Sequence, residues 1–371
     1  MTELPGVTDA TTPPADRATT PPADRATTPP ADRATTPRAD RATTPPVDWA
    51  DPHWRDAALG WVGDQLGRLG RRIVGPVEPR VRPWSLVWRV PTDAGDVWFK
   101  ANNPGTRYEA ALLAALARLA PGRVLDPVAV DAERGWSLLP DGGRTLRDAL
   151  GGDRSLLSRW ERVLPEYADL QRVVAPGAGE LLALGVPDYR PEMLPELFEA
   201  LLDDEESLLL GAADGLTAEA YGRLRAHRPA FAEDCRRLAA SGLTPTVQHD
   251  DLHDGNVFVA GDGHRFFDWG DASVAHPFGT LLVTLNSVAD AFGLPEGDPA
   301  LTRLRDAYLE PWSDGHDRPT LREAARLAVR VTRVSRALSW RRALRSADPT
   351  RAEYAAAVPG WLQELFAPDP V

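Results

Sequence analysis

Fold class and chemistry are both indicated most clearly by one segment, His249-Asp250-Asp251-Leu252-His253-Asp254-Gly255-Asn256-Val257-Phe258-Val259. It begins with His-x-Asp, carries an asparagine five residues after that aspartate, and ends in an apolar run typical of a strand. A hydroxyl that attacks a phosphoryl group needs a carboxylate to orient it and to accept its proton. The segment therefore predicts a catalytic loop in which Asp251 is the base.

A further carboxylate, Asp268, follows directly after the strand-like run Arg265–Phe267. This run and Val257–Val259, separated by Gly261-Asp262-Gly263, predict a hairpin. Such a hairpin brings Asn256 and Asp268 to the same end. Phosphoryl transfer from a nucleotide needs a metal ion that bridges the phosphates, and Mg²⁺ prefers oxygen ligands. We therefore expect Asn256 and Asp268 to hold Mg²⁺ against the phosphates of ATP.

The chain has a single lysine, Lys100, among its 42 basic residues. Lysine is a compact point charge suited to a phosphate oxygen, whereas arginine is a planar fork. Lys100 is the last residue of the run Asp96–Lys100. This run is expected to pair with Trp84–Val90 through a turn at Asp93-Ala94-Gly95. The position predicts a lysine on a strand that binds nucleotide phosphates. The alternative is that Lys100 has no special role and is a lysine that remained by chance.

Composition divides the 371 residues into three regions. Residues 1–50 repeat the octapeptide Ala-Thr-Thr-Pro-Pro-Ala-Asp-Arg, which has no large apolar side chain to bury, so we expect a disordered tail. Residues 51–139 combine helical and strand patterns, and residues 140–371 are mainly helical. These ranges predict a small, β-rich, nucleotide-binding N-lobe and a larger C-lobe with the catalytic loop and the substrate pocket.

These motifs, in this order, resemble the aminoglycoside phosphotransferase family, which includes choline kinase and related small-molecule kinases. The resemblance runs from Asp51 to the C-terminus and rests on Lys100, Asp251, Asn256 and Asp268 in their sequence context. It implies an α+β, bilobal, protein-kinase-like fold. It also implies ATP-dependent phosphorylation of a hydroxyl group on a small molecule.

The resemblance assigns partners to Lys100. The ammonium would contact the α- and β-phosphates, and Glu109, on a helix expected from Arg107 to Leu119, would pair with it. Glu109 has a second interpretation, because Thr106-Arg107-Tyr108-Glu109 has the pattern of a capping box, in which the glutamate bonds the start of its helix. Both interpretations place Glu109 at a helix start, but only the ion pair would bring it to the site.

Other residues receive roles by the same resemblance. Leu139, in the expected hinge between the lobes, would lie where a backbone contacts adenine. Ser85 and nearby amides would cover the phosphates, because the loop Arg82–Val87 lacks the glycines that let a backbone approach phosphate closely. His249 and His253 would support the catalytic loop rather than act as bases.

The acidic residues near the predicted site do not decide whether the acceptor is cationic. Asp250 and Asp254 flank the predicted base, and they either contact a cationic substrate or face water. Asp203–Glu206, in a helix expected over Leu197–Leu210, either bind amino groups or form a solvated helix face. Asp271 is expected to cap a helix or to brace the loop.

Bulk properties narrow the class of partner. A net charge of −12 argues against nucleic acid and is compatible with a cationic small molecule. The single cysteine, Cys235, and an N-terminus unlike a signal sequence favour the cytoplasm. No run approaches 18 consecutive apolar residues, so no membrane association is expected.

The leading interpretation is an ATP- and Mg²⁺-dependent O-phosphotransferase whose acceptor is an aminoglycoside, amino sugar, amino alcohol or similar metabolite. The alternative is a non-catalytic, kinase-like nucleotide-binding or scaffold protein, which the glycine-free loop would favour. A protein kinase is disfavoured, because no Ala-Pro-Glu sequence follows Asp268.

Overall fold

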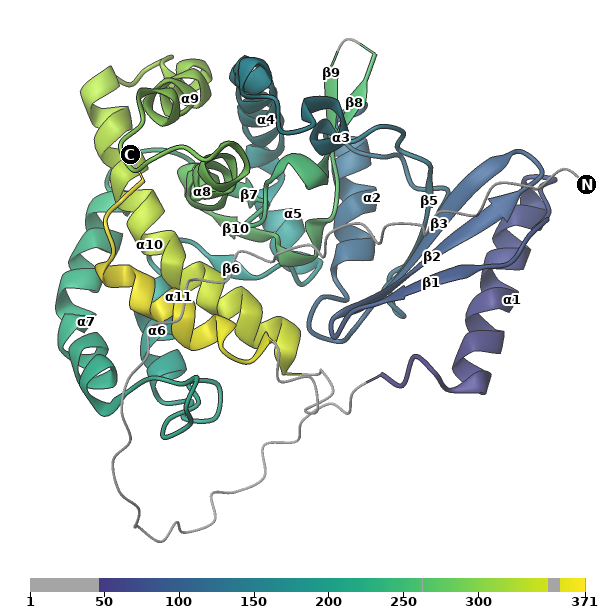
Figure 1. Ribbon diagram of the computed structural model, residues 1–371, viewed down its shortest axis with the longest axis horizontal. Coiled ribbons are helices and arrows are strands. Elements are labelled where there is room, and N and C mark those ends of the chain that lie inside the picture. The colour runs from purple at the N-terminus through teal and green to yellow at the C-terminus, as the bar shows by residue number, and fades with distance from the viewer. Residues whose placement is uncertain (1–46, 262, 346–353, 371) are drawn as a thin grey trace, which may run out of the picture.

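The computed structural model describes residues 47–261, 263–345 and 354–370. Within these ranges the chain forms two lobes, one built on a sheet and one mainly helical (Figure 1). The two-lobed α+β arrangement is the one that the sequence predicts. The expected disordered tail, residues 1–50, lies outside the described residues except for its last four positions. In the described part, no helix is both long and apolar enough to cross a membrane.

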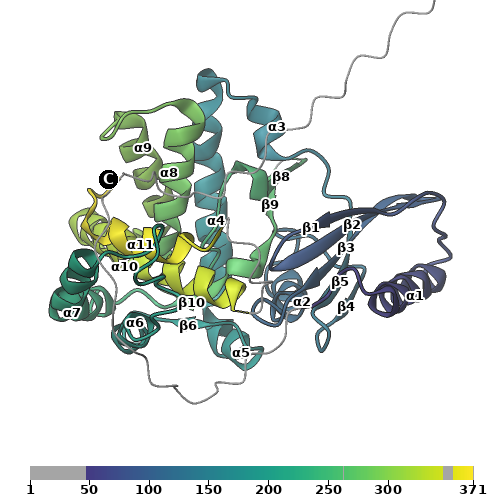
Figure 2. The same ribbon diagram turned by 60° about the horizontal axis from the view of Figure 1, so that its bottom comes forward.

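The N-lobe sheet has five antiparallel strands among the described residues, in the order β1-β2-β3-β5-β4. Helix α1 lies on the outer face of the sheet, and α2 lies between the sheet and the C-lobe (Figures 1 and 2). The elements are α1 (Pro52–Arg68), β1 (Glu78–Val81), β2 (Ser85–Thr92), β3 (Gly95–Asn102), α2 (Glu109–Leu119), β4 (Ala129–Asp131) and β5 (Trp136–Pro140).

Aromatic side chains fill the N-lobe core between α1 and the sheet. Trp54 packs edge-on against Trp88 and Trp136, with 5.8 Å between ring centroids in each pair. Phe99 on β3 is fully buried against the same rings. Because successive side chains of a strand point to opposite faces, burial of Phe99 turns the next residue, Lys100, toward the C-lobe. The aromatic core thereby sets the direction of the only lysine.

The C-lobe is built around α10, the longest helix in the described chain, most of which is buried. Short strands lie between α10 and the N-lobe and carry the predicted catalytic loop (Figure 1). The elements are α3 (Leu146–Leu150), α4 (Trp160–Val174), α5 (Ala178–Ala183), β6 (Asp188–Tyr189), α6 (Leu194–Leu202), α7 (Ala218–Ala239), β7 (Thr246–Gln248), β8 (Val257–Ala260), β9 (Gly263–Phe266), β10 (Ser273–Ala275), α8 (Leu281–Phe292), α9 (Pro299–Leu309), α10 (Arg318–Leu344) and α11 (Ala357–Gln363).

The two lobes touch through aromatic side chains as well as through the covalent connection after β5. Trp84, just before β2, packs edge-on against Trp340 of α10 and against Tyr354, with centroid distances of 5.4 and 5.1 Å. Beside them, Asn103 Nδ2 donates a buried hydrogen bond of 2.8 Å to the carbonyl of Ala343. The end of α10 therefore lies against the loop that precedes β2.

The helix expected over Leu197–Leu210 is wrong in its second half, because α6 ends at Leu202. The acidic residues that follow bond arginines of distant helices instead of continuing the helix. Asp203 lies 2.9 Å from Arg225, and Asp204 lies 2.6 Å from Arg341. Both acids are therefore paired with arginines and are not free to bind amino groups of a substrate, while Asp203, with 62% of its side chain exposed, still lies at the solvated surface, as one of the two interpretations expects.

Gly142, just after β5, offers a test of how the hinge packs. A Cβ added there would clash with the ring of Phe258, which itself stacks on Phe267 at 4.0 Å. We expect Gly142→Ala to lower the free energy of unfolding by about 1–3 kcal/mol, because overpacking forces the rings or the backbone to move. Gly63→Ala is the matched control: open space surrounds Gly63 inside α1, so alanine should stabilise by about 0.5–1 kcal/mol. Urea denaturation of both variants checks the expectation, and equal effects would contradict it.

Candidate active site

Lys100 lies at the centre of a charged cluster between the lobes. Its Nζ is 2.5 Å from Oδ1 of Asp268 and 2.7 Å from Oε2 of Glu109. The three residues come from β3, from the start of α2 and from the segment after β9. The side chains of Lys100 and Glu109 are 11% and 7% exposed, whereas that of Asp268 is 51% exposed. The cluster is therefore buried on the side of the N-lobe and open at Asp268.

Charges in this cluster stabilise one another. Burial alone would lower the pKa of Lys100, but the carboxylates of Asp268 and Glu109 outweigh that effect and raise it. Surrounding protein atoms oppose ionisation of Asp268, but the ammonium of Lys100 outweighs them and lowers its pKa. Burial raises the pKa of Glu109 against the opposing effect of Lys100. Lys100 is thus held as a cation next to an ionised Asp268.

Of the two interpretations of Glu109, the ion pair with Lys100 is the one present. Helix α2 begins at Glu109, and its N-cap residue, Tyr108, makes no side-chain capping bond. Thr106, the other member of the expected capping box, donates its hydroxyl to the carbonyl of Trp84 at 3.3 Å. Both carboxylate oxygens of Glu109 lie within 2.8 Å of Lys100.

The loop that carries Asp251 is tied to the hairpin of β8 and β9. Asn256 Nδ2 donates to the carbonyl of Asp251 at 3.0 Å, and the amide of Phe267 donates to the carbonyl of Asn256 at 3.1 Å. Strands β8 and β9 pair Val257 with Phe266, so Asn256 and Asp268 lie at the same end of the hairpin, as their spacing predicts. The structure therefore brings Asp251, Asn256, Asp268 and Lys100 to one region.

Two side chains in this region offer oxygen atoms that suit Mg²⁺. The amide nitrogen of Asn256 is used by the Asp251 carbonyl, which leaves its Oδ1 as a ligand atom. Lys100 contacts Asp268 through Oδ1, so Oδ2 is the second candidate atom. No group of three or more His, Cys, Asp or Glu among the described residues could hold a metal ion. The donor set fits an ion that takes its remaining ligands from phosphates and water.

His249 and His253, expected to support the loop of Asp251, both bond backbone groups near it. His249 is fully buried, its Nε2 lies 2.8 Å from the carbonyl of Phe267, and its ring packs against Trp269 at 4.6 Å. Burial lowers the pKa of His249, so the neutral ring donates to that carbonyl. His253 Nδ1 accepts from the amide of Gly255 at 3.0 Å. These bonds hold the loop from both sides of Asp251.

Neither expectation for Asp250 holds, because this residue faces neither water nor substrate. It is 1% exposed, and it accepts a 2.6 Å hydrogen bond from Ser273 Oγ and a second bond from Gln248. Its φ of 62° lies in the left-handed region, which is uncommon for a residue other than glycine. Asp254 is likewise occupied, since it forms a 2.8 Å ion pair with Arg147 of α3.

Asp250 predicts a pH effect on stability. Burial raises its pKa from 3.8 to about 6, so the folded protein binds this proton more tightly than the unfolded chain. The stabilisation from protonated Asp250 is therefore complete below pH about 4 and is lost as the pH rises through 6. Asp250→Asn should remove this loss. Between pH 4 and 7, the free energy of unfolding of the variant should therefore rise relative to that of wild type by at most about 3 kcal/mol. Parallel curves of stability against pH for the two proteins would contradict this assignment.

Ser85 and Leu139, expected to contact the nucleotide, lie on β2 and β5, the two strands that flank β3 in the N-lobe sheet. Ser85 pairs with Asn102, two residues from Lys100 on the same face of β3. Its amide already donates to the carbonyl of Arg82 at 3.3 Å, and the residue is buried. Leu139 is half-buried on β5 opposite Trp98. Ser85 could therefore cover a phosphate only after a local rearrangement.

One charged residue of the site was missed by sequence reasoning. Arg336 of α10 places Nη2 3.3 Å from Oδ1 of Asp251 and Nη1 3.2 Å from Oδ2 of Asp271. Asp271 thus braces the loop, which is one of its two expected roles. The available signal was an arginine inside the apolar helical pattern Val329–Leu338, where a charge needs a partner.

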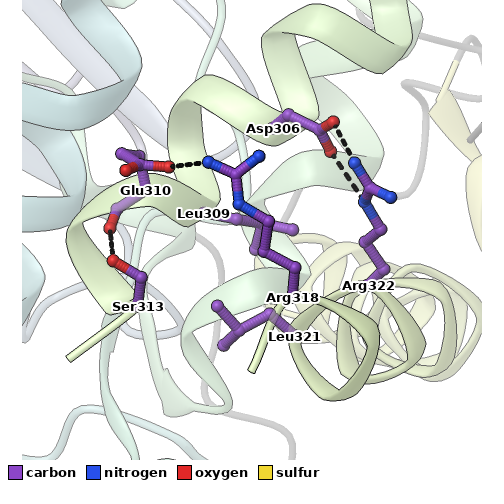
Figure 3. A pocket seen from close by; sticks show the side chains of 7 residues that line it. All are labelled: Asp306, Leu309, Glu310, Ser313, Arg318, Leu321 and Arg322. Atoms are coloured by element: carbon purple, nitrogen blue, oxygen red, sulfur yellow. Dashed lines mark hydrogen bonds and ion pairs between the residues drawn. The ribbon is translucent and has the colours of Figure 1, made fainter. Parts of the chain in front are cut away.

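A cavity elsewhere in the C-lobe is unsuited to a substrate. It lies between α9 and the start of α10, and ion pairs of Asp306 with Arg322 and of Glu310 with Arg318 cross it (Figure 3). Its volume of about 20 Å³ suffices for about one water molecule. Arg318 and Arg336 are 18 positions apart on α10, or about 27 Å along the helix axis. The cavity is therefore separate from the site at Asp251.

The chain matches a model of the phosphotransferase enzyme family over residues 78–278, more than half of its length. The chain belongs to this family. The matched range contains Lys100, Glu109, Asp251, Asn256 and Asp268. The chain is accordingly a phosphotransferase with an alcohol group as acceptor, as the sequence predicts, and no curated protein matches it in sequence.

Solved structures with low sequence identity share the fold. A choline/ethanolamine kinase family protein from Mesorhizobium loti is 18% identical, with a TM-score of 0.53 over 84% of this chain and 94% of the other. Choline kinase from Cryptosporidium parvum is 11% identical, with a TM-score of 0.56 over 84% and 95%. Aminoglycoside 2′-phosphotransferase-IIIa, solved with GDP, is 15% identical, with a TM-score of 0.54 over 83% and 97%. The predicted protein-kinase-like fold is confirmed.

Proposed function

We propose that the chain transfers the terminal phosphoryl group of ATP to a hydroxyl group of a small molecule, with Asp251 as the general base. One observation supports this most directly: the Nζ of Lys100 lies 2.5 Å from Asp268, at the hairpin end that also carries Asn256 and the Asp251 loop. A cation for phosphates, two oxygen ligands and a carboxylate base are the parts that phosphoryl transfer requires.

Each residue has a distinct task in this proposal. Lys100, oriented by Glu109, binds phosphate oxygens of the nucleotide, and Asn256 and Asp268 hold Mg²⁺. The ion, when bound, neutralises charge that develops on the phosphates. Asp251 orients the acceptor hydroxyl and takes up its proton as the oxygen attacks the terminal phosphorus, while the bond from that phosphorus to the bridging oxygen breaks and ADP leaves. His249 and His253 keep the loop in place and exchange no proton with the substrate.

The lobes divide these tasks. We assign nucleotide binding to residues 51–139, with Leu139 near the base and Ser85 near the phosphates, and catalysis and acceptor binding to residues 140–371. A cytoplasmic location stays a prediction from the single cysteine. The alternative of a non-catalytic scaffold has little support, because the base, both metal ligands and the lysine are all retained.

The acceptor is proposed as a hydroxylated metabolite, with aminoglycosides and amino alcohols as the first classes to test. Choline and ethanolamine kinases and aminoglycoside phosphotransferases are among the structurally similar proteins. A cationic acceptor is compatible with the net charge of −12, although Asp203, Asp204, Asp250 and Asp254 are bonded within the protein.

A screen of acceptors tests the proposal. The purified chain is incubated with Mg-ATP, and in parallel with Mg-GTP, and each of a panel of aminoglycosides, amino sugars and amino alcohols. We expect at least one acceptor to accelerate nucleoside diphosphate release and to gain a phosphoryl group by mass spectrometry. Thermal-shift measurements with each nucleotide accompany the screen. Absence of both transfer and stabilisation at millimolar Mg-ATP or Mg-GTP would reject the proposal.

A further inference from the structure

We propose that Arg336 is a positioning residue for the transfer reaction, whose guanidinium holds the carboxylate of Asp251 in place and ties it to the segment after Asp268. The inference rests on the proposed role of Asp251 as the base. Nothing in the motif around Asp251 includes Arg336, which follows that residue by 85 positions and comes from a different element.

The geometry of Arg336 suits a clamp between two carboxylates. Nη2 lies 3.3 Å from Oδ1 of Asp251, and Nη1 lies 3.2 Å from Oδ2 of Asp271. A guanidinium is planar and rigid, so one group that bonds two carboxylates fixes their relative placement. Asp271 is three residues after Asp268 and ends the short turn Trp269–Asp271. Arg336 therefore links the loop of the base to the segment of the proposed metal ligand.

Burial makes this clamp specific. The side chain of Arg336 is 2% exposed, and its guanidinium carbon lies 5.7 Å from the ring centroid of Trp361 on α11. Burial alone would lower its pKa, but the carboxylates of Asp271, Asp251 and Asp250 outweigh that effect and raise it. A buried ion pair is weak evidence for stability, because an apolar residue would avoid the cost of desolvation. The effect of Arg336 on the position of Asp251 explains the presence of this buried charge better than a contribution to stability does.

Arg336 also connects the base to the N-lobe through α10. Trp340, one helical turn later, packs against Trp84, which directly precedes Ser85 at the start of β2. The same helix thus contacts the loop of the base at one turn and the nucleotide-binding lobe at the next. Arg336 thereby holds the loop of the base on the helix that also contacts the N-lobe.

The chain provides a matched control one turn earlier on α10. Arg333 is also 2% exposed, but it pairs with Asp369 at 2.9 Å and donates to the carbonyl of Pro368 at 2.7 Å. These partners belong to the C-terminal segment and not to the loop of Asp251. Replacing Arg333 therefore removes an equally buried guanidinium without touching the base.

The test compares the kcat of wild type with that of variants at Arg336 and Arg333. The reaction followed is ADP release from Mg-ATP, with the acceptor found in the screen or with water as acceptor. We expect Arg336→Met to lower kcat about 10- to 100-fold while KM for Mg-ATP changes less than about threefold, because a small displacement of a catalytic group has such an effect. Arg336→Lys should give an intermediate loss. Arg333→Met should keep kcat within about threefold of wild type at a comparable shift in Tm.

A double-mutant cycle separates positioning from general damage. If Arg336 acts through Asp251, then Arg336→Met should lower kcat less than about threefold in the Asp251→Asn background, because residues that act as a unit are not additive. A full additional loss in that background, or an equal loss for Arg333→Met, overturns the inference. If Arg336→Met does not fold, Arg336→Lys is used in the same cycle with the same criterion. Wild-type activity of Asp251→Asn would reject the proposed role of Asp251 as the base, whereas a large loss there with no effect of Arg336→Met rejects only the role of Arg336.

Discussion

Asp251→Asn is expected to lower kcat for phosphoryl transfer by about 10²- to 10⁴-fold, the usual contribution of a general base. Asparagine keeps the size of the side chain and retains an oxygen for the bond from Arg336, but it cannot take up the proton of the acceptor. Mg-ATP binding should change little, because Asp251 is not among the groups proposed to contact the phosphates. The variant thus separates chemistry from nucleotide binding.

Single-turnover transfer to the identified acceptor measures this loss, and the thermal shift with Mg-ATP measures binding. Asp254→Asn is the control, because Asp254 belongs to the same loop but is paired with Arg147. We expect it to keep kcat within about threefold of wild type. Transfer by Asp251→Asn at more than a tenth of the wild-type rate would assign the base to another residue.

Lys100→Met has the second large expected effect, on nucleotide use and on stability together. Loss of the ammonium removes the cation for the phosphates, and kcat/KM for Mg-ATP should fall about 10²- to 10³-fold. It also leaves Glu109, which is 7% exposed, without its partner. Removal of one member of a buried pair destabilises by about 3–5 kcal/mol, so the midpoint of urea unfolding should fall as well.

Two further variants distinguish the causes. In Lys100→Met combined with Glu109→Gln the stranded charge is absent, so stability should recover while kcat/KM stays low. Lys100→Arg keeps the charge, but a planar guanidinium replaces a compact ammonium between Glu109 and Asp268. The free energy of unfolding should therefore decrease less than kcat/KM does. Recovery of activity in the double variant would show that Lys100 serves folding and not nucleotide binding.

Most of the fold is predictable because its signals are local. The aromatic run before Lys100 and the turn at Asp93-Ala94-Gly95 specify the hairpin of β2 and β3, whose register follows from the turn. The short turn that contains Gly261 and Gly263 specifies the hairpin of β8 and β9 in the same way. Lys100 lies within β3, Asn256 directly precedes β8 and Asp268 follows β9. Because each is placed by such a local element, the convergence of the three residues could be expected from the sequence.

Charge pairing between distant elements could not be predicted in the same way. Asp250 was expected at the surface, yet Ser273 and Gln248 satisfy it in the interior. Asp204 was placed in a helix, yet it bonds Arg341, which is 137 residues away. A carboxylate in a polar stretch reads as exposed unless the position of its cation is known, and that position depends on the tertiary fold. Arg336 was missed for the same reason.

The aromatic contact between Trp84 and Trp340 has a consequence for the timing of each catalytic cycle. The covalent connection after β5, the Lys100–Asp268 ion pair and the bonds of the Tyr108 hydroxyl to the segment after Asp268 also join the two lobes, so the lobes cannot move apart as freely as a pair joined by one flexible connection. If release of the nucleotide needs the lobes to separate, the contact between these two rings must break in each cycle. Motions of this kind take microseconds to milliseconds and often govern turnover. The contact between Trp84 and Trp340, which takes no part in bond making, would then be one of the contacts that affect how fast one round follows another.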